Sequence, residues 1–292
     1  MELSVISPLE QPEALRKFIW EAGLRFPEQP DTPLFWTGLS LNDRLIACAA
    51  IEVYENDGLL RSVAVAKEYR GKSYGAALLK AAVILARLKK LRSLYLFTEN
   101  AKDFFEQHGF KPMERTQLPA NITSSEQAAQ ECGIQAHVMY RAVPESPPLF
   151  LVLCTGNSCR SQMAHAYLAK YLAGRGSVYS AGVETHGLNP GAVSILMEDG
   201  LDITQHTSNH VDEYGHLRFD FILTVCDHAR ETCPWIPGNA LRIHHNFSDP
   251  SKVKGSHEEV HSAFLRTREE ISSFCRKLAE ALNPDDKQSI PQ

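Results

Sequence analysis

The feature that most constrains the fold is a short loop that joins an apolar stretch to an amphipathic one. The apolar stretch covers 149–153, and the loop after it reads Cys154-Thr-Gly-Asn-Ser-Cys-Arg160-Ser161. A short, bounded apolar run predicts a buried strand of a parallel sheet. The amphipathic stretch that follows predicts a helix over 162–173 that ends at Gly174. A strand that passes through a tight loop into a helix is typical of an α/β domain.

Three prolines within six residues interrupt the chain at 143–148. Proline continues neither a helix nor a central strand, so this stretch predicts an extended connector. A length of 292 residues also favours two domains over one. We therefore expect a first domain at 1–142, a linker at 143–148, a second domain at 149–282 and a polar tail at 283–292 that frays.

Composition and charge exclude several classes of protein. The chain is 43% hydrophobic and 22% charged, the balance of an ordinary folded protein. It has neither an apolar run of about 20 residues nor a basic start followed by an apolar block, so we expect no membrane span, no secretory signal and a cytoplasmic location. There are 17 basic and 18 acidic residues up to residue 147, and 13 and 17 after it. Neither half has the basic excess that nucleic acid binding requires.

The loop after the first strand of the second domain predicts a nucleophile aimed at an anion. Backbone N–H groups at a helix N-terminus bind oxyanions, Gly156 permits a tight turn, and Arg160 can clamp two oxygens. The same positive field is expected to lower the pKa of Cys154. Cys154 would be the nucleophile and Cys159 a packing or assisting thiol. The loop's oxyanion-binding residues would be Thr155, Gly156, Asn157, Ser158, Cys159 and Ser161.

Residues 148–282 resemble the low-molecular-weight tyrosine phosphatases, and among them the thioredoxin-coupled arsenate reductases. The resemblance is carried by the Cys-x5-Arg-Ser loop and by the stretches 178–187, 224–234 and Asp249-Pro250. It implies that Cys154 attacks arsenate and that Asp249 is the general acid. It also implies that Cys226 attacks the Cys154 adduct to release arsenite, and that Cys233 takes over the disulfide for thioredoxin.

Electron counting supports a role for the last two thiols. Ester hydrolysis needs only a nucleophile, an oxyanion clamp and an acid, whereas reduction of arsenate needs two electrons from a dithiol. Cys226 follows a strand expected at 221–225, so it should emerge at the same sheet edge as Cys154. Helix between Cys226 and Cys233 would hold their α-carbons ~10 Å apart, too far for a disulfide. We therefore expect this segment to unwind when the two thiols are oxidised.

Other roles for these residues stay open. Cys226 and Cys233 could ligate zinc with His228, His244 or His245, or both could simply be buried, but the wide spacing and the missing second pair disfavour zinc. The chain has His165 and Asn209 where many of these reductases have carboxylates linked to a potassium ion. Asn157 and Ser180 are retained. Without two carboxylates, we expect no metal site.

The first domain contains a weaker anion-binding motif. Strands are expected at 45–54 and 59–65, joined by a turn at 55–58, and helices at 75–88 and 101–108 with a strand at 94–97 between them. The basic glycine loop 70–75 (Arg-Gly-Lys-Ser-Tyr-Gly) follows a strand and opens a helix, so its backbone N–H groups can hold a pyrophosphate. Proline-rich and polar stretches at 27–33 and 119–125 are expected to be loops.

Residues 1–142 resemble the GNAT N-acetyltransferases, through the loop and through the stretches 94–101 and 104–110. The resemblance implies a mixed-sheet α/β domain that binds acetyl-CoA. Ser73 replaces the usual glycine, which crowds the approach of the pyrophosphate. Asn100, Glu52 and Tyr140 are candidates for contacting the acceptor, which the sequence does not identify. The implied acetyl-CoA contacts are Val63, Val65, Arg70, Gly71, Lys72, Ser73, Tyr74 and Gly75.

Together these patterns predict a bifunctional detoxification enzyme, in which a GNAT-like mixed-sheet domain precedes a parallel-sheet phosphatase-like domain. The second domain would reduce arsenate with thioredoxin or a similar dithiol protein, and the first would transfer acetyl groups. One alternative is a phosphatase acting on phosphotyrosine or small phosphoesters, although Phe247-Ser248 stand where phosphatases of this fold carry an aromatic pair. A second alternative for the first domain is a coenzyme A sensor without turnover.

Overall fold

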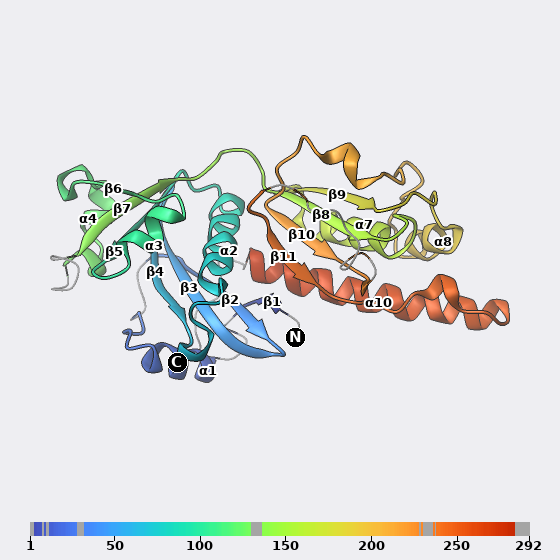
Figure 1. Cartoon of the computed structure of the whole chain (residues 1–292), viewed down its shortest axis with the longest axis horizontal. Helices are drawn as coiled ribbons and strands as arrows, with labels where there is room; N and C mark the ends of the chain where they lie inside the picture. The colour runs from blue at the N-terminus through green and yellow to red at the C-terminus, as the bar shows by residue number, and fades with distance from the viewer. Residues whose placement is uncertain are drawn as a thin grey trace. The chain divides into compact units, whose positions relative to one another are not determined.

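The computed structural model describes residues 3–7, 9, 12–27, 32–129, 136–227, 229, 236 and 238–283. The chain divides into two compact units (Figure 1). Residues Val5–Ser146 belong to one unit and Pro147–Glu280 to the other. Each unit has its own sheet and is described separately below.

The N-terminal unit is built on a mixed sheet with the strand order β1-β2-β3-β4-β5-β7-β6. The described neighbours are antiparallel except for β4 and β5, which run parallel. This parallel pairing covers only Asp57–Leu59 against Ser93–Tyr95, although both strands continue beyond it. The strands are β1 (Leu3–Ile6), β2 (Leu34–Leu41), β3 (Arg44–Tyr54), β4 (Asp57–Val65), β5 (Ser93–Thr98), β6 (Lys111–Pro112) and β7 (His137–Ala142).

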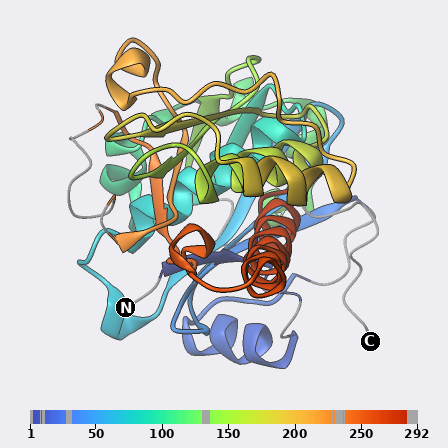
Figure 2. The ribbon, with the colours of Figure 1, turned by 90° about the vertical axis from the view of Figure 1, so that its right-hand side faces the viewer.

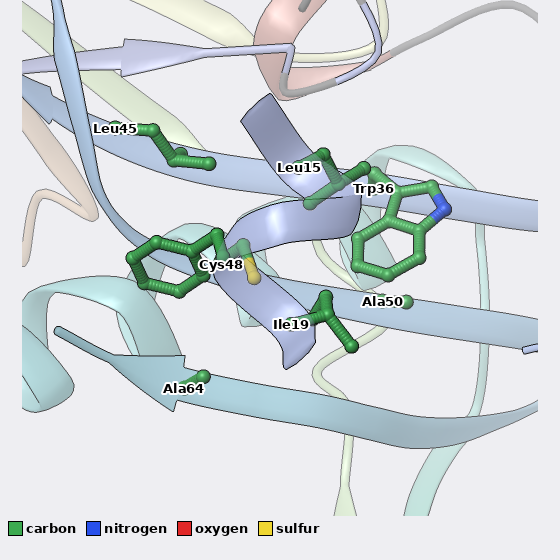
Figure 3. Packing of buried hydrophobic residues seen from close by; sticks show 8 residues of the cluster. Leu15, Ile19, Trp36, Leu45, Cys48, Ala50 and Ala64 are labelled. Carbon is green, nitrogen blue, oxygen red and sulfur yellow. The ribbon is translucent and has the colours of Figure 1, made fainter. Parts of the chain in front are cut away.

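Helix α1 closes part of this sheet with an apolar stripe. Leu15 and Ile19 lie one turn apart on the helix and are completely buried against Trp36 of β2 and Cys48 of β3 (Figure 3). The longer α2 contacts β2, β3 and β4. The helices of this unit are α1 (Pro12–Glu21), η2 (Lys67–Tyr69), α2 (Tyr74–Leu88), α3 (Lys102–Gln107), η3 (Arg115–Gln117), α4 (Ala120–Thr123) and α5 (Glu126–Ala129), of which η2 and η3 are 3-10 helices.

The C-terminal unit has a four-stranded parallel sheet with the order β11-β10-β8-β9. The strands are β8 (Leu149–Cys154), β9 (Ser177–Gly182), β10 (Phe221–Thr224) and β11 (Leu241–His244). The helices are α7 (Arg160–Leu172), α8 (Pro190–Glu198), η4 (Val211–Tyr214), η5 (Pro250–Lys252) and α10 (His257–Leu282), of which η4 and η5 are 3-10 helices. Figure 2 shows α10, in red, beside α8.

Alternate residues of β8 face opposite sides of this sheet. Leu151 and Leu153 pack in a cluster with Val211 of η4 and with Phe219. On the other side α7 contacts β8 and β9, and α10 joins α7 through the thiol of Cys275, which donates to the Ala164 carbonyl at 3.7 Å. In the described part, one side is therefore covered by long helices and the other by a 3-10 helix and its neighbouring segments.

The expected elements are present with small shifts at their ends, and the parallel sheet of the second unit is confirmed. Three expectations need correction. The turn between β3 and β4 is limited to residues 55 and 56, because Asp57 and Gly58 already pair with β3. The stretch 119–125 is not all loop, since it contains the single-turn α4. Helix α7 ends at Leu172, one residue earlier than expected, and both Ala173 (φ 49°) and Gly174 (φ 76°) after it are left-handed.

Strands β2, β7, β9 and β11 were not expected as such, and each completes a sheet around the elements that were. None of the helices in the described ranges is long and apolar enough to cross a membrane.

Candidate active sites

Cys154 is the last residue of the central strand β8, and its thiol lies inside the loop that leads to α7. Its side chain is buried, with 4% of its surface exposed. The sulfur lies 2.8 Å from the Ser161 hydroxyl and accepts the Asn157 N–H at 3.1 Å. The loop thus turns a hydroxyl and a backbone donor toward one sulfur atom, which is the geometry expected for an anion-binding nucleophile site.

The expectation of a lowered Cys154 pKa is wrong for this structure. Burial raises the pKa of the thiol, and this exceeds the lowering caused by Ser161 and by the Asn157 N–H. The Cys226 thiol is close enough to raise it further. Desolvation dominates because the charged thiolate would lose its water, while the guanidinium of Arg160 is directed at Asp249 instead of the sulfur.

Arg160 and Asp249 come together from the start of α7 and the start of η5. Nη2 of Arg160 donates to Asp249 Oδ2 at 2.8 Å, and Nη1 donates to the Phe247 carbonyl at 3.0 Å. Asp249 also accepts the N–H of Ser251 at 3.1 Å, so it caps η5. The sequence placed both residues in one site, and the structure brings them into direct contact. An oxyanion in the loop would compete with Asp249 for the guanidinium.

A network of hydrogen bonds that the sequence analysis missed holds the loop at Asn157. Asn157 has a left-handed backbone (φ 44°) and is fully buried. The side-chain amide of Gln162 donates to the Asn157 backbone oxygen at 3.0 Å, to the Asn157 side-chain oxygen and to the Thr207 carbonyl at 2.9 Å. His206 Nδ1 lies 3.0 Å from Gln162 Oε1. The one feature of the sequence that could have indicated this network is the polar Gln162, two residues after Arg160 at the start of the predicted helix.

Cys226 lies two residues after the end of β10 and reaches the same sheet edge as Cys154, as expected. Its sulfur lies 3.4 Å from the hydroxyl of Thr155, the residue next to Cys154, and accepts the Ala229 N–H at 3.4 Å. Only 3% of its surface is exposed. Cys233 and the segment 230–235, including the expected unwinding, lie outside the described residues.

The remaining loop residues have separate structural roles. Burial raises the pKa of Cys159 to about 12, and nearby Asp249 adds to this, so its thiol is protonated and inert as a nucleophile. The Ser158 carbonyl accepts the Asn189 N–H at 3.0 Å. Gly156 has no room for a side chain, because the His186 ring lies where its Cβ would be. His186 was another residue that the sequence analysis did not single out.

The region linked to potassium in the resemblance contains two stacked histidines. The rings of His165 and His206 are 4.5 Å apart, and His165 Nδ1 lies 3.1 Å from the Ser180 hydroxyl. Burial, followed by His206, lowers the pKa of His165 to about 4. Asn209 instead bonds Thr207 and Glu213. Among the described residues no group of three or more His, Cys, Asp or Glu could hold a metal ion.

The N-terminal unit contains a cavity of about 930 Å³ where β4 and β5 stop pairing. Leu60–Val65 line one wall and Leu96–Ala101 another, with Phe104 and His108 of the α3 region between them. Most of its exposed lining is apolar. The cavity therefore opens between two parallel strands at the point where their pairing ends.

The expected cofactor residues lie at this cavity in part. Val63, Val65, Arg70, Gly71, Ser73 and Gly75 line it. Lys72 and Tyr74 instead pack on Tyr69, with Lys72 Nζ 5.6 Å from the ring. Ser73 is forced into the left-handed region (φ 64°), whereas Gly71 is left-handed with open space around it. At Gly71 the loop therefore has open space beside its backbone, shortly before the start of α2.

The three candidate acceptor-side residues have different positions. Asn100 lines the cavity. Glu52 is buried in an ion pair with Arg61, and Tyr140 packs against Tyr95 with ring centroids 6.4 Å apart. Only Asn100 is placed to contact a substrate directly. Arg61, which the sequence analysis did not consider, lines the cavity.

Two family models match the chain. The model described as low molecular weight phosphotyrosine protein phosphatase matches residues 150–288, and the model described as acetyltransferase (GNAT) domain matches residues 35–112. The two matches fall in the two parts for which the sequence analysis stated these resemblances.

Curated relatives match the second part. An arsenate reductase of Halalkalibacterium halodurans is 46% identical over 128 residues, which are 44% of this chain and 92% of the relative. One of Bacillus subtilis is 44% identical over 128 residues, with the same coverage. A solved acetyltransferase of the GNAT family from Staphylococcus aureus aligns with 49% of this chain and 99% of its own, at 18% identity and a TM-score of 0.40.

Proposed function

This chain belongs to the arsenate reductases built on the low molecular weight phosphotyrosine protein phosphatase domain, and it also carries a GNAT acetyltransferase domain. We therefore propose that it catalyses two separate reactions, one in each domain. The C-terminal domain reduces arsenate to arsenite with Cys154, Cys226 and Cys233. The N-terminal domain transfers acetyl groups from acetyl-CoA to an amine.

The first step forms a bond between sulfur and arsenic. The Cys154 thiolate attacks arsenate in the loop 154–161, and a hydroxyl leaves arsenic as water after accepting a proton. Backbone N–H groups at the start of α7 and the Arg160 guanidinium stabilise the oxyanion. When the substrate takes the guanidinium from Asp249, the Asp249 carboxyl becomes available to protonate the leaving oxygen.

The second step carries the redox change. The Cys226 thiolate attacks the Cys154 sulfur, a disulfide forms, and the arsenic–sulfur bond breaks with its electron pair on arsenic. Arsenic(V) becomes arsenic(III) and leaves as arsenite, while two thiols are oxidised. Cys233 then attacks Cys226 and frees Cys154. A dithiol protein of the thioredoxin class reduces the Cys226–Cys233 disulfide by thiol exchange.

One observation carries this proposal: two buried thiols, Cys154 and Cys226, lie at the carboxyl ends of the adjacent parallel strands β8 and β10. Thr155 bridges the space between them through its contact with Cys226 at 3.4 Å. Ester hydrolysis has no use for a second thiol at this place.

The test is a count of free thiols after exposure to arsenate without an external reductant. We expect the wild type to lose two thiols per arsenite released, Cys226→Ser to stall at the arsenic adduct, and Cys233→Ser to trap a Cys154–Cys226 disulfide. Cys275→Ser is the matched control, since Cys275 is buried between α10 and α7 away from the loop. Steady hydrolysis of an aryl phosphate with no arsenate-dependent thiol loss would support the phosphatase alternative instead.

The N-terminal proposal rests on the cavity between β4 and β5. The residues present fit acetyl-CoA, because β4 and β5 stop pairing beside the cavity and the loop 70–75 opens α2 with room at Gly71. Val63 and Val65 would bind its extended arm, and the loop would bind its pyrophosphate. Acetyl-CoA supplies an acetyl group activated as a thioester.

Calorimetric titration with acetyl-CoA tests this part. Arg70→Glu should weaken binding about tenfold or more, because it replaces a positive charge at the loop by a negative one. Lys111→Glu makes the same charge change on the exposed β6 and should leave the affinity unchanged. Equal affinity in both variants would contradict the assignment of the loop. Tight binding without acetylation of any amine would favour the sensor alternative.

A further inference from the structure

A buried ion pair lies beside the cavity of the N-terminal unit. Nη1 of Arg61 on β4 donates to Oε2 of Glu52 on β3 at 2.7 Å, and their exposed fractions are 8% and 2%. The other oxygen of Glu52 accepts the Tyr54 hydroxyl at 2.5 Å and the Thr32 hydroxyl at 3.1 Å. Because both of its oxygens are occupied, Glu52 acts as a support for Arg61 and not as a base.

Of the two residues in this ion pair, only Arg61 lines the cavity. Arg61 belongs to the cavity lining and Glu52 does not. Among the residues that the structure describes, no acceptor bonds the remaining guanidinium nitrogens of Arg61. Burying a charged pair is costly, and it contributes little to stability compared with apolar packing. A rigidly held guanidinium with free donors matches the geometry of a carboxylate.

A bulge in β4 follows Arg61 immediately. Arg61 is paired with Ala50 and Ala64 with Cys48, so Ser62 and Val63 together face the single residue Ala49. Ser62 takes the left-handed conformation (φ 53°). Bulges of this kind redirect side chains. Arg61 shares a face with Glu52 because it pairs with Ala50 in the regular register before the bulge. The bulge separates Arg61 from the Val63–Val65 stretch to which the acetyl-CoA arm is assigned.

A second polar group of the lining lacks a partner. The side-chain oxygen of Gln127 on α5 is buried and accepts no hydrogen bond in the described part of the chain. A buried acceptor of this kind needs a donor. The cavity thus offers free donors at Arg61 and a free acceptor at Gln127 within a mostly apolar lining.

We propose that the acetyl acceptor is a small primary amine that carries a carboxylate, that is, a compound of the amino acid class. Its carboxylate binds the free nitrogens of Arg61, and its amine lies toward Val63, where the acetyl group is delivered. Gln127 accepts an N–H of the ligand. This inference rests on the proposed acetyltransferase activity and adds the class of its acceptor.

The experiment compares matched acceptors on the full-length protein. Each L-amino acid of a panel is tested beside its carboxamide and its decarboxylated amine, and the acetylated product is quantified by mass spectrometry. We expect at least one amino acid to exceed both neutral counterparts roughly 10- to 100-fold in kcat/KM, the effect of one hydrogen-bonded charge pair. Calorimetry on the CoA-loaded protein should show the same ranking in affinity without turnover.

Variants of the ion pair assign the effect to Arg61. Arg61→Gln alone leaves the buried Glu52 without its partner and can fail to fold. The double variant Glu52→Gln/Arg61→Gln removes both charges and keeps a hydrogen bond between the side chains. This double variant should lose the preference for the amino acid both in kcat/KM and in calorimetric affinity. Its affinity for CoA should stay unchanged, which shows that the domain is still folded. Glu52→Gln alone keeps the guanidinium and should retain the preference.

The outcomes separate the two proposals. If neutral amines are acetylated as well as amino acids, or if the double variant keeps the preference, the class of acceptor assigned here is wrong and the acetyltransferase activity stands. If no amine of the panel is acetylated although CoA binds, the acetyltransferase activity itself fails, and this inference fails with it.

Discussion

At the scale of single residues, the reactivity of Cys154 is set by opposing effects. Burial raises the pKa of its thiol, and the Ser161 hydroxyl and the Asn157 N–H oppose this increase. The thiol is therefore a weaker nucleophile than its position at a helix N-terminus suggests. The Arg160 guanidinium contributes no hydrogen bond to this sulfur, because it donates to Asp249 and to the Phe247 carbonyl.

Ser161→Ala should slow alkylation of Cys154 by iodoacetamide. The variant removes a hydrogen-bond partner 2.8 Å from the sulfur, which raises the pKa of the thiol further. Loss of one hydrogen bond predicts a roughly three- to tenfold lower rate at pH 8. Labelling is followed site by site by mass spectrometry, with Cys226 as the internal reference. An unchanged rate at Cys154 would show that Ser161 does not stabilise the thiolate.

The buried His165 makes the stability of the C-terminal domain depend on pH. Its pKa is lowered to about 4 by burial and by His206, against about 6.5 in an unfolded chain. The unfolded state binds the proton more readily than the folded state. The folded domain therefore has its full stability with respect to His165 above about pH 6.5, and it loses part of its free energy of unfolding as the pH falls toward 4.

Between pH 7.5 and pH 5, the wild type should therefore lose about 2 kcal/mol of unfolding free energy through this residue. The variant His165→Asn has no histidine to protonate at this position, so its free energy of unfolding should fall by about 2 kcal/mol less between the same two pH values. Urea denaturation at the two pH values, with the C-terminal transition identified by hydrogen exchange, measures the difference. Parallel pH profiles for the two proteins would contradict the lowered pKa.

At the scale of elements, the active loop is shaped by contact with the end of β9. A side chain at Gly182 would lie under 3.0 Å from three backbone atoms, namely the carbonyl oxygens of Glu184 and Thr155 and the nitrogen of Asn157. Backbone atoms of the loop cannot move away without disturbing Cys154. The position of the loop therefore depends on a glycine that the catalytic motif does not contain.

Gly182→Ala should lower arsenate reduction at least tenfold and destabilise the domain by about 1–3 kcal/mol, the usual cost of overpacking. Gly215→Ala is the matched control, since Gly215 has helical backbone angles and its nearest neighbour to an added Cβ, the Asp212 oxygen, is 3.3 Å away. Kinetics and thermal unfolding of both variants provide the measurement. Similar behaviour of the two would show that the loop adapts to the added methyl group.

At the scale of the whole molecule, each proposed reaction uses residues of one unit. The residues that line the N-terminal cavity all fall in the sequence range from Ala22 to Ala136. The described residues that contact Cys154, Arg160 and Cys226 all fall in the range from Cys154 to Asp249. The geometry therefore assigns each chemistry to its own domain.

Two single variants should separate the activities. Cys154→Ser should abolish arsenate reduction and leave the affinity for acetyl-CoA unchanged, because the thiol belongs only to the C-terminal loop. Arg70→Glu should weaken acetyl-CoA binding and leave the kcat/KM for arsenate within twofold. Both quantities are measured on the full-length protein. A change larger than fivefold in the activity of the unaltered domain would show that the sites are coupled.

The sequence by itself determined the features that depend on neighbouring residues. The apolar run before Cys154, the glycine in the loop and the helix after Arg160 predicted strand, turn and helix, because periodicity and backbone freedom are local properties. The same reasoning placed Cys226 at the edge shared with Cys154, since parallel strands end on one side of a sheet.

Tertiary structure alone decided what the loops and partner strands bring to these sites. The raised pKa of Cys154, the Gln162 and His206 support beneath Asn157, and the pairing of Arg61 with Glu52 all depend on burial and on contacts between distant segments. Desolvation and long-range hydrogen bonds have no signature in local sequence, so the chain's motifs located the chemistry, and only the folded arrangement specified its electrostatics and its proposed acceptor.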